Sequence, residues 1–235
     1  TPPTIRITGD LLHHLRDSLR LHPGDSLTLN DACGTRYQVE VTGVTAQIIE
    51  SRIVETLTAP ARVSPSISLA QALLKGEKMD WVIQKAAELG VDSIFPVNTK
   101  HGVVKIHPDR LGRQRTRWQR IALEAAQQSE RWTVPTIAEP GDLSQLAMVY
   151  PPSASKFILM ERSASPSLSI VPLPTGPDQT VAILIGPEGG WDQEEQQRVL
   201  EQGFTAVTLG TRILRAETAA IAALSIVQSR LGELG

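Results

Sequence analysis

The apolar run from Val181 to Ile185, which ends at the turn GPEGG (residues 186–190), constrains this fold more than any other stretch. A continuous run rich in β-branched residues is typical of a strand covered on both faces. Three glycines in the turn leave backbone amides uncovered. Asp192 and Glu195 then match a capping box, which predicts that a helix follows. Because open parallel sheets bind ligands at the carboxyl ends of their strands, the GPEGG turn is a candidate binding loop.

A second glycine, Gly210, follows a second expected strand from Thr205 to Leu209. The polar residues that come next are Arg212, Arg215, Glu217 and Thr218. If the two strands are neighbours in one sheet, their glycine ends lie together, and we expect the functional site there. The GPEGG turn alone is equally well explained as a tight strand-to-helix connection. Neither a P-loop nor a G-x-G-x-x-G fingerprint follows a strand, so the common nucleotide motifs are absent.

From residue 67 onward the sequence alternates between strand and helix patterns. Strands are expected at 67–74, 93–97 and 157–161, with helices at 76–89 and 109–129. This alternation predicts a mainly parallel sheet with helices on both faces.

The first 57 residues instead show period-two alternation, at 37–44 and 47–55, after a possible short helix at 10–19. They predict a small β barrel or sandwich. The segment 58–65 contains two prolines and has the composition of a linker. We therefore expect two domains, 1–64 and 65–235.

Composition excludes several classes of protein. The single cysteine, Cys33, rules out an intramolecular disulfide and a cysteine-built zinc site, which favours the cytoplasm. His13, His14 and His22 lack partners at metal-ligand spacing, so no metal is expected. We also expect neither a signal peptide nor a membrane-spanning segment.

The net charge of −2 hides an uneven distribution. Residues 65–132 contain 11 Lys and Arg against 7 acidic residues, whereas residues 133–235 contain 6 against 11. The basic middle third is either a solvated helix face or a surface for nucleic acid, and composition leaves both open.

Four segments together resemble the RsmE family of SPOUT-class RNA methyltransferases: GPEGG at 186–190, LGTRILRAETAAIAAL at 209–224, KGEKMDWVIQKAAELGV at 75–91 and RWQRIALEAAQQSER at 117–131. The resemblance implies methylation of a uridine at N3 in 16S (small-subunit) ribosomal RNA, with S-adenosylmethionine as donor. It implies an α/β fold: a SPOUT-type parallel sheet with a C-terminal trefoil knot, preceded by a small PUA-like β-barrel domain. Two departures fall on expected RNA-contact surface, Glu130 in place of glycine and Lys100-His101-Gly102 in place of an Arg-Ser pair.

The same resemblance places the cofactor between the glycine loops and the strand end near residue 160. The expected cofactor-binding residues are Leu159, Glu161, Ile185, Gly186, Glu188, Gly189, Gly190, Leu209, Gly210, Ile213, Leu214 and Thr218. Glycines allow close backbone approach, and the aliphatic residues supply apolar walls.

Uridine N3 must lose its proton before it attacks a methyl group, so the site needs a base or a cation that stabilises the anion. The candidates are Arg215, which holds base or phosphate, and Glu217, which accepts the proton or fixes the arginine. The alternative is a purely structural Arg215–Glu217 pair that caps the last helix.

The expected RNA-binding residues are Arg6, Arg36, Lys75, Lys78, Lys105, Arg131 and Arg162. The resemblance also implies a homodimer, and small residues along the last helix, 217–231, permit a close contact there. A non-catalytic RNA-binding assembly factor and a small-molecule α/β enzyme remain the alternatives.

Overall fold

The computed structural model describes residues 3–31, 34–161 and 164–234, and it divides into two compact units, Thr1–Ala61 and Arg62–Gly235. Cys33 and Arg162 lie outside the described residues. In the part of the chain that is described, no helix is long and apolar enough to cross a membrane.

The first unit is an antiparallel sheet with one short helix. Its strands, in the spatial order β1-β4-β3-β2, are β1 (Thr4–Ile7), β4 (Ile49–Thr58), β3 (Thr35–Val44) and β2 (Ser26–Asn30). Alternate residues such as Val39 and Val41 are buried, which accounts for the period-two pattern. Helix α1 (Gly9–His13) continues as a π-helical turn (His14–Ser18) and covers the core with Leu12 and Leu15. The predicted β module is confirmed.

The second unit contains a seven-stranded sheet among the described residues, and its strand pairings are parallel, as the sequence predicted. The order is β11-β9-β10-β5-β6-β7, with β8 also paired to β6. The strands are β5 (Ser66–Ala72), β6 (Ser93–Asn98), β7 (Thr136–Ile137), β8 (Gly141–Asp142), β9 (Ser155–Leu159), β10 (Thr180–Ile185) and β11 (Thr205–Val207).

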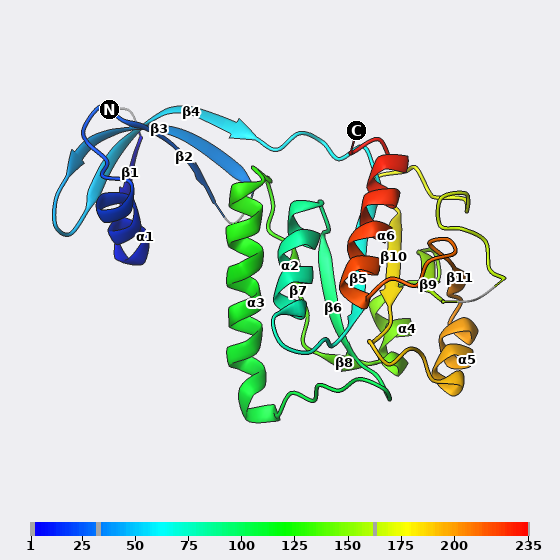
Figure 1. The fold of residues 1–235 in the computed structure, drawn as a ribbon. Coiled ribbons are helices and arrows are strands. Elements are labelled where there is room, and N and C mark those ends of the chain that lie inside the picture. Colours follow the sequence, from blue (N-terminus) through cyan, green and yellow to red (C-terminus); the bar gives the residue numbers. More distant parts are fainter. Residues whose placement is uncertain (1–2, 32–33, 162–163, 235) are drawn as a thin grey trace. The chain divides into compact units, whose positions relative to one another are not determined.

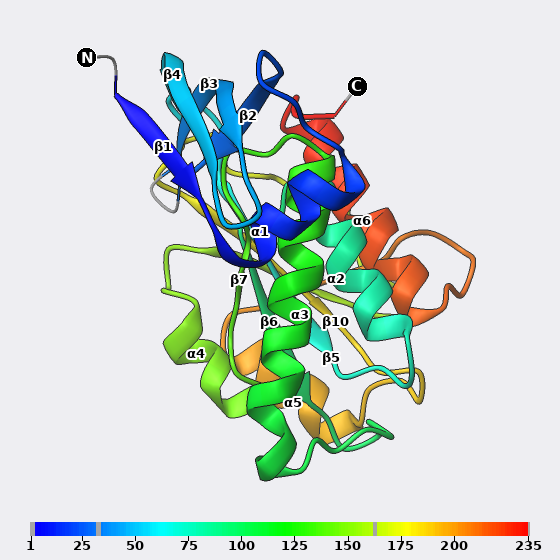
Figure 2. The ribbon, with the colours of Figure 1, turned by 90° about the vertical axis from the view of Figure 1, so that its left-hand side faces the viewer.

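Helices cover both faces of this sheet (Figures 1 and 2). One face carries α2 (Lys78–Glu88), α3 (Pro108–Gln128) and α6 (Ala216–Arg230), with α2 between the other two. The opposite face carries the 3-10 turn Leu143–Gln145, α4 (Leu146–Val149) and α5 (Gln193–Glu201). Val82 and Ile83 of α2 and Trp118 of α3 are buried against the sheet and belong to the inner faces of these helices.

The expectation that the strands ending in GPEGG and Gly210 are neighbours is wrong. Strand β9 lies between β10 and β11, with Val207 paired to Leu159. The reason is that β10 is already hydrogen-bonded on both sides, to β5 and to β9. Strand β11 therefore pairs at the free edge of β9, and the end of β9 separates the two glycine loops.

Candidate active site

The GPEGG turn packs on the indole ring of Trp191. A Cβ atom at Gly186 would lie 2.9 Å from this ring, so only glycine fits there. The indole Nε1 of Trp191 donates a hydrogen bond of 2.9 Å to the carbonyl oxygen of Leu159, the last residue of β9. One side chain therefore ties the turn after β10 to the end of β9. Trp191 is not among the residues expected from the sequence, although its position directly after the turn was a signal.

The loop after β6 contacts the other side of the turn. A Cβ atom at Gly189 would lie 3.0 Å from Cβ and 3.1 Å from the carbonyl oxygen of His101. The Nδ1 atom of His101 lies 3.3 Å from the carbonyl oxygen of Gly190, whose φ of +74° is one that glycine adopts readily. Three strand-end loops thus meet at the GPEGG turn.

The predicted capping box at the start of α5 is confirmed, with Asp192 as N-cap and Glu195 at N3. Lys100 binds both carboxylates: its backbone amide donates to Glu195 Oε1 (2.7 Å) and its Nζ to Asp192 Oδ2 (2.9 Å). This hydrogen bond raises the pKa of Lys100 and lowers that of Asp192. The segment 100–102, which was expected on an RNA-contact surface, therefore also stabilises the start of α5.

Lys78, at the start of α2, joins the GPEGG turn to the start of α6. Its Nζ donates to Glu188 Oε1 (2.9 Å) and lies 3.6 Å from Glu217 Oε1. Burial alone would raise the pKa of Glu188, but the hydrogen bonds from Lys78 and from backbone amides lower it below its usual value. The hydrogen bond to Glu188 raises the pKa of Lys78. Lys78 was expected to bind RNA; in this structure its ammonium group is held by two carboxylates.

The two candidate catalytic residues lie at the start of α6 but do not bind each other. Arg215 is the N-cap residue and is exposed, whereas Glu217 lies in the first turn with 14% of its side chain exposed. Among the described residues no hydrogen bond or ion pair joins them, and Arg215 makes no side-chain cap. The purely structural Arg215–Glu217 pair is therefore absent, and Glu217 pairs with Lys78 instead.

The remaining predicted cofactor residues lie in the loop between β11 and α6, except Glu161, which follows β9, and Thr218, in the first turn of α6. Gly210 has a φ of +114°, and Thr208 stabilises the turn through hydrogen bonds with the amide (3.2 Å) and carbonyl (3.1 Å) of Gly210. Leu209 packs against the main core, whereas Ile213 is half exposed. The others are Leu214, partly buried, and Thr218 and Glu161, both exposed.

Two buried oxygens near these strand ends have no hydrogen-bond partner in the described residues, Gln71 Oε1 and Glu217 Oε2. Gln71 is fully buried in β5 and is paired with Ile185, the residue before the GPEGG turn. Buried polar atoms are normally satisfied, so such orphans indicate where a polar ligand group or water binds. Both oxygens accept hydrogen bonds and suit a donor such as an amine or hydroxyl.

The candidate RNA-binding residues are scattered. In the first unit, Arg6 forms an exposed ion pair with Glu50 (3.6 Å), and Arg36 is partly buried in β3. In the second unit, Lys75 and Lys105 are exposed at the strand-end side, before α2 and before α3. Arg162 lies outside the described residues.

Arg131 requires a correction. Its guanidinium donates to the carbonyl oxygens of Ala87 (2.9 Å) and Val91 (2.7 Å), and only 13% of the side chain is exposed. Burial lowers the pKa of Arg131, against a raising contribution from Asp92. A guanidinium committed to buried carbonyls that end α2 stabilises the fold, so Arg131 is not available as an RNA contact.

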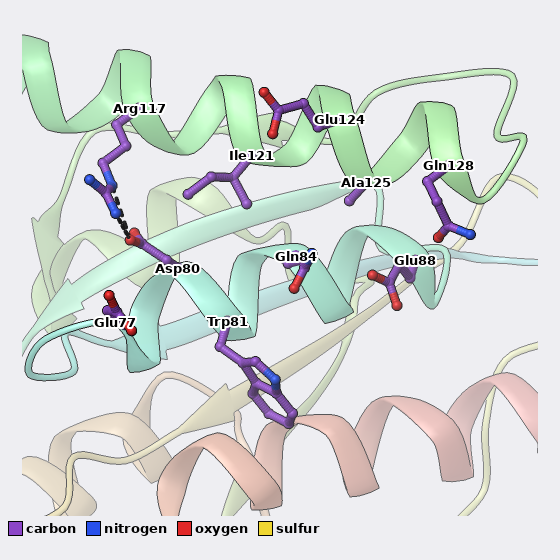
Figure 3. Close-up of a pocket in the computed structure, with 10 residues that line it drawn as sticks. All are labelled: Glu77, Asp80, Trp81, Gln84, Glu88, Arg117, Ile121, Glu124, Ala125 and Gln128. Carbon is purple, nitrogen blue, oxygen red and sulfur yellow. Dashed lines mark hydrogen bonds and ion pairs between the residues drawn. The ribbon is translucent and has the colours of Figure 1, made fainter.

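A groove of about 390 Å³ lies between α2 and α3 (Figure 3). Arg117 donates to Asp80 at its floor, while Glu77, Glu88 and Glu124 line its walls. No group of three or more His, Cys, Asp or Glu that would hold a metal ion occurs in the described ranges.

Comparisons with known proteins agree with this geometry. Residues 62–228 match the model of an RNA methyltransferase domain, and residues 7–54 match that of an RNA methyltransferase PUA domain. The chain is 32% identical to the ribosomal RNA small subunit methyltransferase E of Bacillus subtilis, over 96% of this chain and 90% of that protein. It is 38% identical to the protein of the same name from Mesomycoplasma hyopneumoniae, over 73% of each.

A solved structure is also similar over almost the whole chain. It is the ribosomal RNA small subunit methyltransferase E of Neisseria gonorrhoeae bound to S-adenosyl methionine, at 32% identity and a TM-score of 0.87. The match covers 97% of this chain and 92% of that one. On the family match, the identities and the shared fold, this chain belongs to the RsmE family of RNA methyltransferases.

Proposed function

We propose that this protein transfers a methyl group from S-adenosylmethionine to N3 of a uridine in 16S ribosomal RNA. The observation that carries the proposal is a pair of contacts made by the GPEGG turn. Trp191 joins the turn to the end of β9, and Lys78 joins it to the start of α6. Those are the segments expected to hold the cofactor and the catalytic residues. Relatives of known name and one relative bound to S-adenosyl methionine support the same activity.

The residues present fit S-adenosylmethionine. When bound, this cofactor supplies a methyl group activated by a sulfonium charge. An added Cβ at Gly186 would meet Trp191 and one at Gly189 would meet His101, so the backbone of the turn carries no side chain at these two positions. Ile185, Leu209 and Leu214 would offer apolar contacts, and the orphaned oxygen of Gln71 marks a buried acceptor on the strand paired with Ile185. The full predicted set would hold the cofactor: Leu159, Glu161, Ile185, Gly186, Glu188, Gly189, Gly190, Leu209, Gly210, Ile213, Leu214 and Thr218.

In the proposed reaction Glu217 takes the N3 proton, and Arg215 holds the uridine or its phosphate. Glu217 Oε2 is buried and has no partner among the described residues, so it is available as an acceptor, while Oε1 faces Lys78. Arg215 is exposed beside it and keeps its donors for a ligand. Glu217→Gln should then lower the transfer rate by roughly 100-fold or more while cofactor affinity persists.

We also propose that residues near the carboxyl end form a trefoil knot. After β11 the chain runs between two segments: Met160 donates to Val207, and the stretch 166–168 pairs with Thr208. Arg230, at the end of α6, then donates to the carbonyl oxygens of Leu168 (2.7 Å) and Val171. The chain at 207–208 is thus flanked on both sides by other segments and is followed by a helix that packs on one of them. This arrangement is consistent with a chain end that passes through a loop.

For RNA, we propose a PUA-like domain at 1–64 and a methyltransferase domain at 65–235, both in contact with substrate in the small ribosomal subunit. Phosphate contacts would come from Arg6, Arg36, Lys75 and Lys105. A cytoplasmic homodimer through α6 completes the proposal. Its support is the row of small residues at 219, 222 and 225, which is only partly buried in one chain.

The decisive test is methyl transfer. Purified protein is incubated with labelled S-adenosylmethionine and with small subunits that lack the modification, and the label is then mapped by nucleoside analysis. Label at uridine N3 supports the proposal, and Arg215→Ala and Glu217→Gln should abolish it. Cofactor binding with no transfer to any RNA would contradict the proposed function and favour a non-catalytic assembly factor.

A further inference from the structure

The amino-terminal half of α3 presents a row of arginines on one face. Arg110, Arg113, Arg117 and Arg120 follow one another at intervals of three and four residues, and all four are exposed. Residues at these intervals lie on the same side of a helix. The helix contains five arginines and only two acidic residues, so this face is strongly cationic.

Two of these arginines have no side-chain partner in the part of the chain that the structure describes. Arg110 and Arg113 make no side-chain hydrogen bond or ion pair with any other described residue. The remaining arginines of α3 are all engaged: Arg115 with Glu139, Arg117 with Asp80 and Arg120 with Glu124. On a helix face that is only solvated, each cation would have a neighbouring carboxylate. On this face of α3, two guanidinium groups remain available to bind a ligand.

The available guanidiniums line a concavity. Its volume is about 350 Å³, and Arg110, Arg113, Gln114 and Arg117 form its walls. Each lining residue offers N–H donors, and none is acidic. A guanidinium stays charged at every physiological pH and presents planar donors that match two oxygens of one phosphate. The chemistry of the concavity therefore suits a phosphodiester.

Helix α2 connects this face to the candidate active site. Asp80 of α2 accepts two hydrogen bonds from Arg117 (3.0 and 2.5 Å) and one from the indole of Trp118 (3.1 Å), which fixes Arg117 in place (Figure 3). Lys78, two residues earlier, holds Glu188 of the GPEGG turn. The arginine row is thus one helix away from the turn, within the same unit of the chain.

We propose that Arg110 and Arg113, next to the anchored Arg117, bind the phosphate backbone of the RNA substrate beside the methylation site. This inference rests on the proposed function, because it assumes that the substrate is ribosomal RNA. It adds a contact surface in the catalytic unit that is independent of the first unit and of the other candidate residues. RNA, rather than an acidic protein, is the favoured occupant because the chain belongs to a family of RNA methyltransferases.

The test is the salt dependence of RNA binding by Arg110→Gln, Arg113→Gln and the double variant. The probe is an unmodified transcript of small-subunit ribosomal RNA, with binding measured over a series of KCl concentrations. Each variant should reduce the slope of log K against log salt by about 1, and the double variant should bind roughly tenfold more weakly. Arg198→Gln is the control, since Arg198 is also exposed but lies on α5, across the sheet, where it pairs with Glu194.

S-adenosylmethionine affinity is measured on every variant and should equal that of the wild type. Unchanged RNA affinity and slope in the double variant would overturn the inference, as would an equal loss in Arg198→Gln. Because binding is read without turnover, these outcomes are distinct from a failure of the proposed function, in which the wild type binds RNA but transfers no methyl group.

Discussion

The indole of Trp191 donates a hydrogen bond to the carbonyl oxygen of Leu159 across the turn that follows β10, and the same ring lies where a side chain at Gly186 would be. The contact joins two neighbouring strand ends, and it predicts that Trp191 positions the cofactor loop. Trp191→Phe retains an aromatic ring and removes only the N–H donor. A lost hydrogen bond of about 1 kcal/mol should weaken S-adenosylmethionine binding roughly fivefold, measurable by calorimetry.

The control for this variant is Trp81→Phe, at an exposed tryptophan on α2 (Figure 3). It should leave the dissociation constant of the cofactor unchanged. Wild-type affinity in Trp191→Phe would show that the hydrogen bond does not position the loop.

Gly186 and Gly112 make a matched pair for testing the turn. Gly186→Ala would place Cβ 2.9 Å from the ring of Trp191 and force the turn to shift, so cofactor affinity should fall at least tenfold. Gly112 lies inside α3 with nothing within 4 Å of an added Cβ. Gly112→Ala should therefore stabilise the protein by about 0.5–1 kcal/mol. Thermal denaturation and cofactor titration of both variants check this, and equal cofactor affinities would contradict the prediction.

The ion pair between Lys78 and Glu188 predicts a defined pH dependence. The folded pKa of Glu188 is below the usual value of 4.5 for glutamate, so its contribution to stability is present above that pH and is lost as the pH falls through the folded pKa. The folded pKa of Lys78 is above 10.5, so its contribution is present below that pH and is lost at higher pH. Stability from this pair should be constant between about pH 5 and pH 10.

Lys78→Met removes the partner and should flatten the acid limb of a plot of melting temperature against pH. Lys85→Met is a suitable control, because Lys85 pairs with Glu88 within α2 and away from the turn. Parallel acid limbs for wild type and Lys78→Met would show that Glu188 owes its lowered pKa to the backbone amides alone.

Arg131 should behave as a structural residue. Arg131→Met leaves the buried carbonyl oxygens of Ala87 and Val91 without their donor, which should cost about 2–3 kcal/mol of unfolding free energy in urea titration. The salt slope of RNA binding should stay at the wild-type value. A lowered slope with wild-type stability would restore Arg131 as an RNA contact.

Local sequence patterns determined much of this protein. The period-two segments, the alternation of strands and helices, the inner faces of α2 and α3 and the capping box at Asp192 depend on contacts between residues close in sequence, so the chain by itself specified them. The GPEGG turn was identifiable because glycine is needed where a backbone approaches other atoms closely, and motif resemblance then indicated the family. The unbroken apolar run of β10 also predicted that this strand is buried on both faces.

Tertiary structure alone decided the rest. The edge at which β11 pairs depends on which strands have free hydrogen-bonding groups after the others have paired, and this placed β9 between the two glycine loops. Charged side chains gave no local signal of their partners, because their contacts join residues far apart in sequence. Lys78 reaches Glu188 and Glu217, Trp191 reaches Leu159, and Arg131 turns inward to the end of α2. An arginine in a basic segment has the same sequence pattern whether it faces buried carbonyls or open solvent, and only the packing of the helices distinguishes the two.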